Sequence, residues 1–227
     1  MSDSTHDHGP RHEGDHSDWE PHFDSAYWDE HYGSSPALWS GKPNPVLVDE
    51  VTDLAPGRAL DVGSGEGADA LWLAGRGWQV LGTDVSQVAL DRAAAAVEAG
   101  GLGDQVMWVQ HDLLAWTPPA RAFDLVSAQF FHLPAGLRPR VYGGLADAVA
   151  PGGTFLVVAH HPSDLDTTMP RPPIEELFFT AGDIAEQLDD EWEIQVSEAR
   201  PRKAKDPDGR EITITDTVLK ARRRRSD

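Results

Sequence analysis

The 227-residue chain contains no cysteine. This absence excludes disulfide bonds, thiolate zinc sites and a cysteine nucleophile, so any metal site would need histidine and carboxylate ligands, and we predict none. Long apolar runs are also missing, because a typical one, residues 155–159, is far shorter than the roughly 20 residues that cross a bilayer. No basic segment followed by an apolar stretch opens the chain, so we expect a cytoplasmic protein without a secretory signal or a membrane partner.

Basic side chains are scarce, since 19 lysines and arginines stand against 38 aspartates and glutamates, for a formal net charge of −19. Affinity for DNA or RNA comes mainly from basic side chains that neutralise phosphates, so a nucleic-acid substrate is not expected. The one basic cluster, residues 222–225, lies near the C-terminal end. We interpret residues 222–227 as a solvated basic tail rather than a binding patch.

Residues 1–22 are polar and lack apolar periodicity, so a disordered tail is predicted there. A histidine-rich tract can bind a metal, but the irregular spacing favours a flexible tail. The histidines concerned are His6, His8, His12, His16 and His22. The remaining length and the 40% hydrophobic composition suit one α/β domain over residues 23–221.

Aromatic residues recur at helical spacing at the start of this domain, at Phe23, Tyr27, Trp28 and Tyr32. The spacing predicts a short helix with one apolar face, which has to pack against something. Because an exposed aromatic stripe would favour aggregation, we expect segment 23–43 to fold over the functional site as a lid. The alternative is that the stripe is ordinary core.

Helix and strand signals alternate along the rest of the domain. Asn44 followed by Pro45 predicts a helix start, and a later helix over about 138–150 is expected to stop at 151–153. The predicted strands are 58–62, 78–83, 105–110, 123–128, 154–160, 192–198 and 211–220. The last two follow each other without a helix and should form a hairpin. The predicted fold is a single doubly wound, Rossmann-like α/β domain, with a mostly parallel seven-stranded sheet and an antiparallel C-terminal hairpin.

Three elements predict a ligand crevice at the carboxyl edge of the sheet. Gly63 and Gly65 remove side chains where the first strand turns into a helix, so a ligand can approach the backbone and the positive helix N-terminus. Asp84 follows the second strand, where a carboxylate can accept both ribose hydroxyls, and Asp112 follows the third. The carboxyl ends of parallel strands meet at one edge, so a nucleotide-like cofactor is predicted there. As a loop carboxylate, Asp84 is expected to matter more for the cofactor than for the fold.

The same region carries a series of motifs. They are Leu-Asp-Val-Gly-Ser-Gly-Glu-Gly at 60–67, Gly-Thr-Asp-Val-Ser at 82–86, Gln-His-Asp-Leu at 110–113, Phe-Asp-Leu-Val-Ser at 123–127 and Pro-Gly-Gly at 151–153. Over roughly residues 40–220 the chain resembles the class I S-adenosylmethionine-dependent methyltransferases. The segments 38–44, 178–183 and 208–209 most resemble the tellurite-resistance and thiopurine methyltransferase-like branch of that family.

This resemblance implies S-adenosylmethionine as the cofactor and a set of contacts to it. Asp61 and the glycine-turn backbone would hold the methionine part, Asp84 the ribose, and Asp112 with Leu113 the adenine. Gln129 would supply a backbone contact near the amino group. The residues implied as cofactor contacts are Trp39, Asp61, Gly63, Ser64, Gly65, Asp84, Val85, Asp112, Leu113 and Gln129.

Methyl transfer from a sulfonium is an in-line displacement in which the cofactor supplies the reactivity, so the protein mainly positions the acceptor and excludes water. A base matters only for an acceptor that carries a proton. His132, past the fourth strand, and His160, past the fifth, are the candidate catalytic residues. The alternative for each is a histidine that only lines the pocket.

The predicted activity is methyl transfer to a small-molecule acceptor by a monomer or homodimer. A non-catalytic adenosylmethionine-binding module stays open as an alternative, since the motifs bind cofactor whether or not an acceptor is methylated. A nicotinamide-dependent oxidoreductase shares the glycine turn and is the second alternative. The absence of a Tyr-x-x-x-Lys pair after the fourth strand disfavours hydride chemistry.

Overall fold

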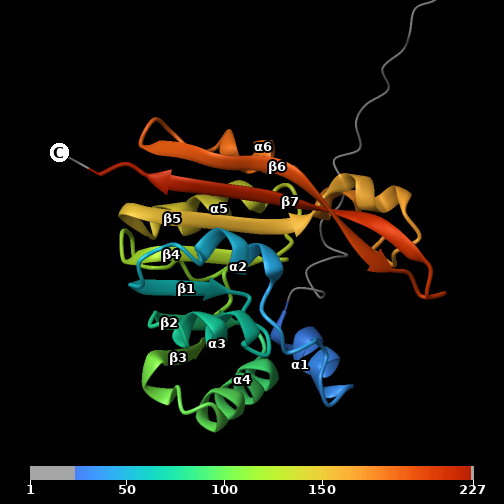
Figure 1. Cartoon of the computed structure of the whole chain (residues 1–227), viewed down its shortest axis with the longest axis horizontal. Coiled ribbons are helices and arrows are strands. Elements are labelled where there is room, and N and C mark those ends of the chain that lie inside the picture. The colour runs from blue at the N-terminus through green and yellow to red at the C-terminus, as the bar shows by residue number, and fades with distance from the viewer. Residues whose placement is uncertain (1–23, 226–227) are drawn as a thin grey trace, which may run out of the picture.

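A computed structural model describes residues 24–225, and one seven-stranded sheet organises them (Figure 1). The strands are β1 (Arg58–Val62), β2 (Gln79–Asp84), β3 (Val106–Gln110), β4 (Phe123–Gln129), β5 (Val149–His160), β6 (Trp192–Lys205) and β7 (Glu211–Arg223). Their order is β3-β2-β1-β4-β5-β7-β6. The first five are parallel neighbours, whereas β7 is antiparallel to both β5 and β6. The predicted parallel sheet with an antiparallel C-terminal hairpin is confirmed.

Helices connect the parallel strands, and their starts follow the capping signals. The helices are α1 (Ser25–Gly33), α2 (Pro45–Val51), α3 (Ala68–Ala74), α4 (Gln87–Ala99), α5 (Arg138–Asp147) and α6 (Ala181–Ala185), with 3₁₀ turns at Gly103–Gln105, Pro162–Asp166 and Glu175–Leu177. The Asn44 side chain accepts a hydrogen bond from Val46 N at the start of α2, as predicted. The Ser86 side chain does the same for Ala89 N at the start of α4.

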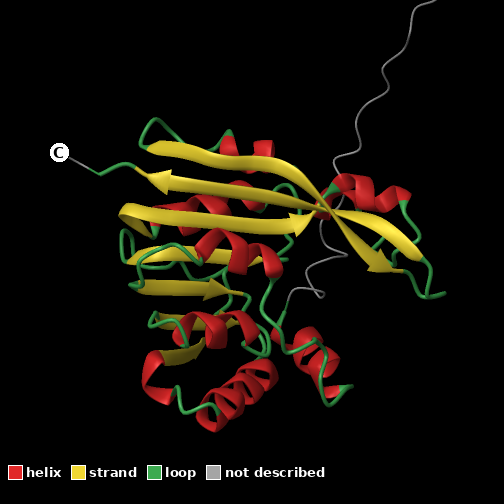
Figure 2. Ribbon diagram, viewed as in Figure 1, coloured by secondary structure: helices red, strands yellow, loops and turns green. Residues whose placement is uncertain are grey.

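Helices cover both faces of the sheet (Figure 2). Leu73 of α3 packs with Leu156 in one core cluster, and Leu145 of α5 packs with Phe155 in the other. Phe155 and Leu156 are neighbours in β5 but belong to different clusters, because successive side chains of a strand point to opposite faces. Both faces of the central strands are therefore buried, which explains their continuous apolar sequences.

The junction between α5 and β5 differs from the prediction. The helix ends at Asp147 instead of about 150, and Val149 already pairs with Phe123 of β4. Residues 151–153 thus lie inside β5, where the pairing register shifts, rather than stopping a helix. Glycine is needed at this irregularity, because Gly152 has a φ of +84° and a Cβ on Gly153 would lie 2.9 Å from the Ala150 carbonyl oxygen.

The C-terminal hairpin is longer than predicted at both ends. Its strands pair from Trp192 with Arg223 to Lys205 with Glu211, and its tip passes beyond the end of β5. The predicted tail boundary at 222 is wrong by two residues, because β7 continues through Arg223. The Arg223 side chain is buried, and its guanidinium lies 5.0 Å from the centre of the Trp192 ring. The cation–π contact and the burial stabilise this residue within the sheet, and a run of four arginines in the sequence does not indicate either of them.

The predicted histidine-rich segment, Phe23, and residues 226–227 lie outside the described residues. Within residues 24–225, no helix has the length and apolar character needed to cross a membrane.

Candidate active site

The turn between β1 and α3 forms the floor of the site. Gly63, Gly65 and Gly67 all have positive φ, at +63°, +52° and +82°. A Cβ on Gly67 would lie 2.7 Å from the Trp108 ring and 2.8 Å from Ala93 Cβ, so this glycine allows helix and strand to pack closely. Gly65 instead faces the N-terminal segment, as described below. The backbone conformation predicted from the glycine spacing is present.

Two buried carboxylates adjoin this turn. Asp84, at the end of β2, accepts hydrogen bonds from Gly65 N at 2.8 Å and from Ser86 N at 2.9 Å. Asp61 lies beside it in β1, and its Oδ2 has no hydrogen-bond partner among the described residues. Burial raises the pKa of both carboxyls, and the charges of Asp69 and Asp84 raise the pKa of Asp61 further. The floor of the site is therefore set up to receive a positive charge.

Asp69, in the first turn of α3, is a third carboxylate that sequence reasoning missed. Its Oδ1 accepts a hydrogen bond from Asn44 N at 2.6 Å, and burial raises its pKa to about 6. The Asn44 side chain in turn donates to Gln129 Oε1 at 2.8 Å, and Gln129 Nε2 donates to Ser127 Oγ at 2.9 Å. A polar network thus joins the starts of α2 and α3 to the end of β4. The Gln129 side chain belongs to this network, and the residue is the last one of β4.

The predicted adenine side lies one strand further along the same edge. His111 N donates to the Asp84 carbonyl at 3.0 Å, and Gln110 Nε2 donates to the Val85 carbonyl at 2.9 Å, which brings the ends of β2 and β3 together. Asp112 is exposed, and its Oδ1 accepts a hydrogen bond from Leu114 N at 2.8 Å. The carboxyl-edge elements therefore converge as predicted.

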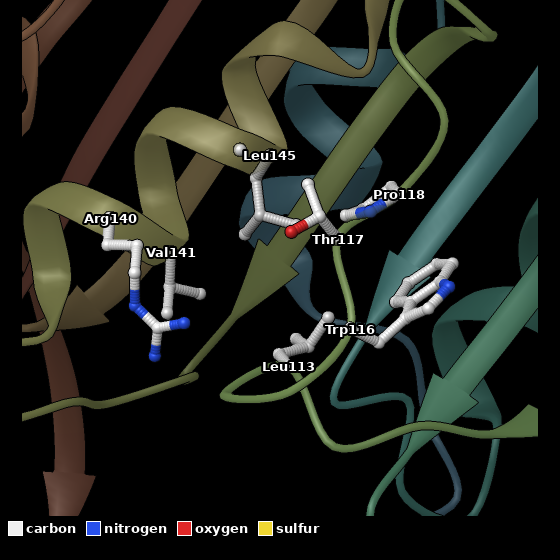
Figure 3. A pocket seen from close by; sticks show the side chains of 8 residues that line it. Leu113, Trp116, Thr117, Pro118, Arg140, Val141 and Leu145 are labelled. Atoms are coloured by element: carbon white, nitrogen blue, oxygen red, sulfur yellow. The ribbon is translucent and has the colours of Figure 1, made fainter.

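A small pocket lies beside this loop, between it and α5. Figure 3 shows Leu113 and Thr117 of the loop near Val141 and Leu145 of the helix. The pocket is lined by Leu113, Trp116, Thr117, Pro118, Arg140, Val141, Gly144 and Leu145. Leu113 is mostly buried and, like Val141 and Leu145, belongs to a core cluster as well as to the lining of the pocket.

The N-terminal segment lies over the glycine turn (Figure 1). Tyr32 of α1 is buried, and its hydroxyl would lie 2.9 Å from a Cβ on Gly65. Trp39 Nε1 donates to that hydroxyl at 3.1 Å, although the Trp39 residue is 56% exposed. Burial, followed by the charge of Asp84, raises the pKa of Tyr32, which keeps the phenol protonated. The segment expected to form a lid is therefore positioned above the predicted cofactor contacts.

Aromatic rings and two histidines form a wall past the ends of β4 and β5. Phe130 has a φ of +54°, an unusual conformation for a non-glycine residue, and its ring centre lies 4.6 Å from that of His160. The His132 and His160 rings stack at 4.9 Å, and Phe178 lies within 6.4 Å of both. Phe131 connects this wall to the glycine turn, because its ring would lie 3.2 Å from a Cβ on Gly63.

The two histidines differ in their free nitrogens. His132 Nε2 accepts a hydrogen bond from His160 N at 3.0 Å, so this nitrogen is engaged. Burial and nearby arginines lower the pKa of His132 to about 4. Proton uptake by His132 at neutral pH is therefore unfavourable, and its catalytic role stays a prediction. His160 Nδ1 is buried without a partner among the described residues, and burial, then His132 and two arginines, lower its pKa to about 2.

Three further charged residues near the turn have contacts that no sequence pattern indicated. They are Asp29 of α1, Glu66 of the glycine turn and Arg92 of α4. Each acts through contacts with residues at least 26 positions away in the sequence. No local periodicity encodes such contacts, so only the folded structure identifies them.

Known proteins are similar to this chain in sequence and in fold. The family model described as a methyltransferase domain matches residues 59–153. A probable thiol methyltransferase 2 of Arabidopsis thaliana is 28% identical over 66% of this chain and 67% of its own length. The 2-heptyl-1-hydroxyquinolin-4(1H)-one methyltransferase of Mycobacteroides abscessus is 30% identical over 65% of this chain and 70% of its own length. The crystal structure of TehB from Haemophilus influenzae matches with a TM-score of 0.66 at 20% identity, over 88% of this chain and 67% of TehB.

The site fits the cofactor of these enzymes. S-adenosylmethionine carries an ammonium and a sulfonium, and the unpartnered Asp61 Oδ2 among three neighbouring carboxylates suits a cation. The glycine turn leaves the backbone at Gly63 and Gly65 without side chains where a ligand can approach. The chain therefore belongs to the class I S-adenosylmethionine-dependent methyltransferases, and its cofactor is S-adenosylmethionine.

Proposed function

We propose that this enzyme methylates a small, readily ionised nucleophile, a thiol in the first instance, bound against the wall of Phe130, Phe131, His160 and Phe178. The observation that carries the proposal is the position of this wall. Phe131 reaches the glycine turn at Gly63, so an acceptor on the wall lies next to the cofactor site. Aromatic rings provide apolar area and polarisable faces for a sulfur atom or a flat heterocycle.

The cofactor contacts expected from the sequence belong to the same proposal. Asp61 would pair with the ammonium of the methionine part, Asp84 would accept the ribose hydroxyls, and Asp112 with Leu113 would border the adenine. The buried and unpartnered Asp61 Oδ2 supports the first of these roles. The remaining proposed contacts are Trp39, Gly63, Ser64, Gly65, Val85 and Gln129.

The bound cofactor supplies an electrophilic methyl group, which forms a bond to the acceptor's nucleophilic atom while its carbon–sulfur bond breaks. The residues of this chain orient the acceptor and keep water away from it. A side chain that removes a proton at neutral pH needs a pKa near 7, and the pKa values of His132 and His160 are lowered to about 4 and about 2. An acceptor that ionises on its own, such as a thiol, therefore suits the site best.

The relatives support an acceptor of this kind. One is named for a thiol and another for an N-hydroxyquinolone. A thiol forms its thiolate at mildly alkaline pH without help, and the thiolate is the reacting species. An aliphatic alcohol would need a strong base, which the wall lacks among the described residues.

The experiment is a transfer assay with cofactor labelled in its methyl group. The acceptor panel comprises small aliphatic and aromatic thiols, a hydroxyquinolone, a phenol, a primary amine and bulk tRNA. We expect transfer to thiols first, with a rate that rises with pH along the acceptor's own ionisation. Transfer to none of them, together with tight cofactor binding, would favour the non-catalytic module, and transfer to tRNA alone would overturn the small-molecule proposal.

The proposal includes three further points: nucleic acid is not a substrate, the protein is a monomer or homodimer, and its location is cytoplasmic. The net charge of −19 supports the first, because phosphate backbones are repelled. The exposed edge strand β6 carries Pro201 among charged residues, which disfavours strand pairing between copies. Analytical ultracentrifugation would measure the oligomeric state directly.

A further inference from the structure

Glu66, in the middle of the glycine turn, binds the backbone of the segment that covers it. Its carboxylate accepts hydrogen bonds from Leu38 N, at 3.2 and 3.1 Å to its two oxygens, and from Trp39 N at 3.0 Å. Burial alone would raise the pKa of Glu66, but the bonds from Trp39 and Arg92 lower it overall. Glu66 is therefore charged at neutral pH, and its hydrogen bonds to the segment are charge-assisted.

Arg92, on α4, completes the connection from the other side. Its Nη1 donates to Glu66 Oε1 at 2.8 Å, and its Nη2 donates to the carbonyls of Tyr32 at 2.8 Å and of Ser35 at 2.7 Å. One planar guanidinium thus binds the end of α1, the following loop and the glycine turn at once. The two side chains are only 27% and 14% exposed, so solvent screens the pair incompletely.

These contacts are placed where they can set the position of the lid, defined here as residues 24–43. Tyr32 and Trp39, the two residues whose polar groups lie over Gly65, are also the residues whose backbone Arg92 and Glu66 hold. Asp29 adds a separate anchor, because its Oδ1 accepts hydrogen bonds from Ser86 Oγ at 2.6 Å and Val88 N at 3.2 Å. Helix α1 accordingly lies against α4.

We propose that the Glu66–Arg92 pair is a positioning device that orders the lid before the cofactor binds, and thereby sets cofactor affinity. The proposal rests on the assignment of the glycine turn as the cofactor site. When a loop becomes ordered during binding, the loss of its conformational entropy makes the binding free energy less favourable. A lid that is already ordered avoids this cost, so residues that order it strengthen binding without contacting the ligand. Glu66 and Arg92 act through the backbone of Tyr32 and Trp39, and are positioning residues rather than catalytic ones.

Three single substitutions and one double variant test the pair. Glu66→Gln keeps the size and one acceptor oxygen but removes the charge that Arg92 pairs with, and we expect about a tenfold weaker Kd for S-adenosylmethionine. Arg92→Met removes three hydrogen bonds and should weaken binding at least as much. Arg92→Lys keeps the positive charge but lacks the planar guanidinium with its several N–H donors, so it should recover only part of the lost cofactor affinity. In the double variant Glu66→Gln/Arg92→Met the losses should not add, because each change breaks the same pair.

The chain offers a matched control in the Arg200–Glu50 pair. Its nitrogen–oxygen distance is 2.7 Å and its side chains are 28% and 13% exposed, nearly the values of the Arg92–Glu66 pair. Glu50 lies on α2 and also bonds Lys220 of β7, away from the lid. Glu50→Gln therefore removes a comparable ion pair and should lower the Tm at least as much as Glu66→Gln, with the Kd for S-adenosylmethionine within twofold of wild type.

The experiment combines titration calorimetry with S-adenosylmethionine and amide hydrogen exchange of the unliganded full chain. We expect faster exchange across residues 32–39 and a loss of affinity of about tenfold or more in Glu66→Gln and in Arg92→Met, and neither change in Glu50→Gln. Equal affinity in all variants, or the same loss in the control, would overturn it. If wild type bound no S-adenosylmethionine, the assigned cofactor site would fail, and unchanged exchange across 32–39 would separately refute the ordering role.

Discussion

Replacing Asp84 with alanine tests both the architecture of the glycine turn and the proposed cofactor contact. From the sequence, Asp84 is a loop carboxylate whose loss should spare the fold. In the structure it is buried, and its two oxygens accept the backbone N–H groups of Gly65 and Ser86 at 2.8 and 2.9 Å. Alanine leaves both donors without an acceptor, so the unliganded protein should lose stability as well as cofactor affinity.

The size of the loss follows from two opposing effects. A hydrogen bond to a charged group contributes about 1.5–3 kcal/mol, so two of them would cost about 3–6 kcal/mol if nothing compensated. Burial, however, raises the pKa of Asp84, which means that the charged carboxylate is itself costly to bury, and alanine removes that cost. We therefore expect a net loss of about 1–3 kcal/mol in the free energy of unfolding.

Urea denaturation of the unliganded variant measures this loss, and calorimetry with S-adenosylmethionine measures the affinity. Asp112→Ala is the control, because Asp112 is exposed and its side chain accepts a single hydrogen bond among residues 24–225, from Leu114 N, so its stability should stay within about 1 kcal/mol of wild type. A free energy of unfolding for Asp84→Ala within about 0.5 kcal/mol of wild type would refute the structural role. An unchanged cofactor affinity would remove Asp84 from the site.

Three further predictions follow from the same contacts. The raised pKa of Asp69, about 6 against 3.8 unperturbed, means that the folded protein holds a proton that the unfolded chain releases, so stability falls as pH rises from about 4 to about 6. Asp69→Asn keeps an acceptor for Asn44 N and should flatten this fall in urea denaturation at pH 4.5 and 7; an equally steep curve would contradict it. The pKa values of His132 and His160 lie at about 4 and about 2, so the rate of methyl transfer should show no change between pH 5 and 8 that is due to histidine titration. A change in rate centred near pH 6.5 that disappears in His160→Gln would contradict this expectation. Trp39→Ala should change the unliganded Tm little, since the residue is 56% exposed, yet weaken cofactor binding; a large Tm loss with normal affinity would make Trp39 a core residue.

Local patterns in the sequence were sufficient for the scaffold of the site. Strand and helix periodicities, the caps at Asn44 and Ser86, and the glycine spacing at 63–67 all act within a few residues. Parallel strands then bring the ends of β1, β2 and β3 to one edge without further information. This is why the fold could be predicted, together with the common edge at which the glycine turn, Asp84 and Asp112 follow their strands.

Lengths and boundaries were less predictable where tertiary contacts overrule local signals. Pro151 and its two glycines favour a helix stop, but pairing of Val149 with Phe123 places them inside β5. A run of arginines favours a solvated tail, but the Trp192 ring and the hairpin register hold Arg223 in the sheet. In both cases the deciding partner is distant in the sequence.

What the sequence by itself determined is the glycine turn and the strand ends that border the proposed cofactor crevice, because neighbouring residues specify them. What only the tertiary structure decided is the chemistry around that crevice. The protonation of His132 and His160 depends on burial by several elements, and the Glu66–Arg92 pair binds backbone groups up to 60 residues away. Burial and long-range hydrogen bonds are properties of packed elements rather than of any local pattern, so they become readable only once those elements are in place.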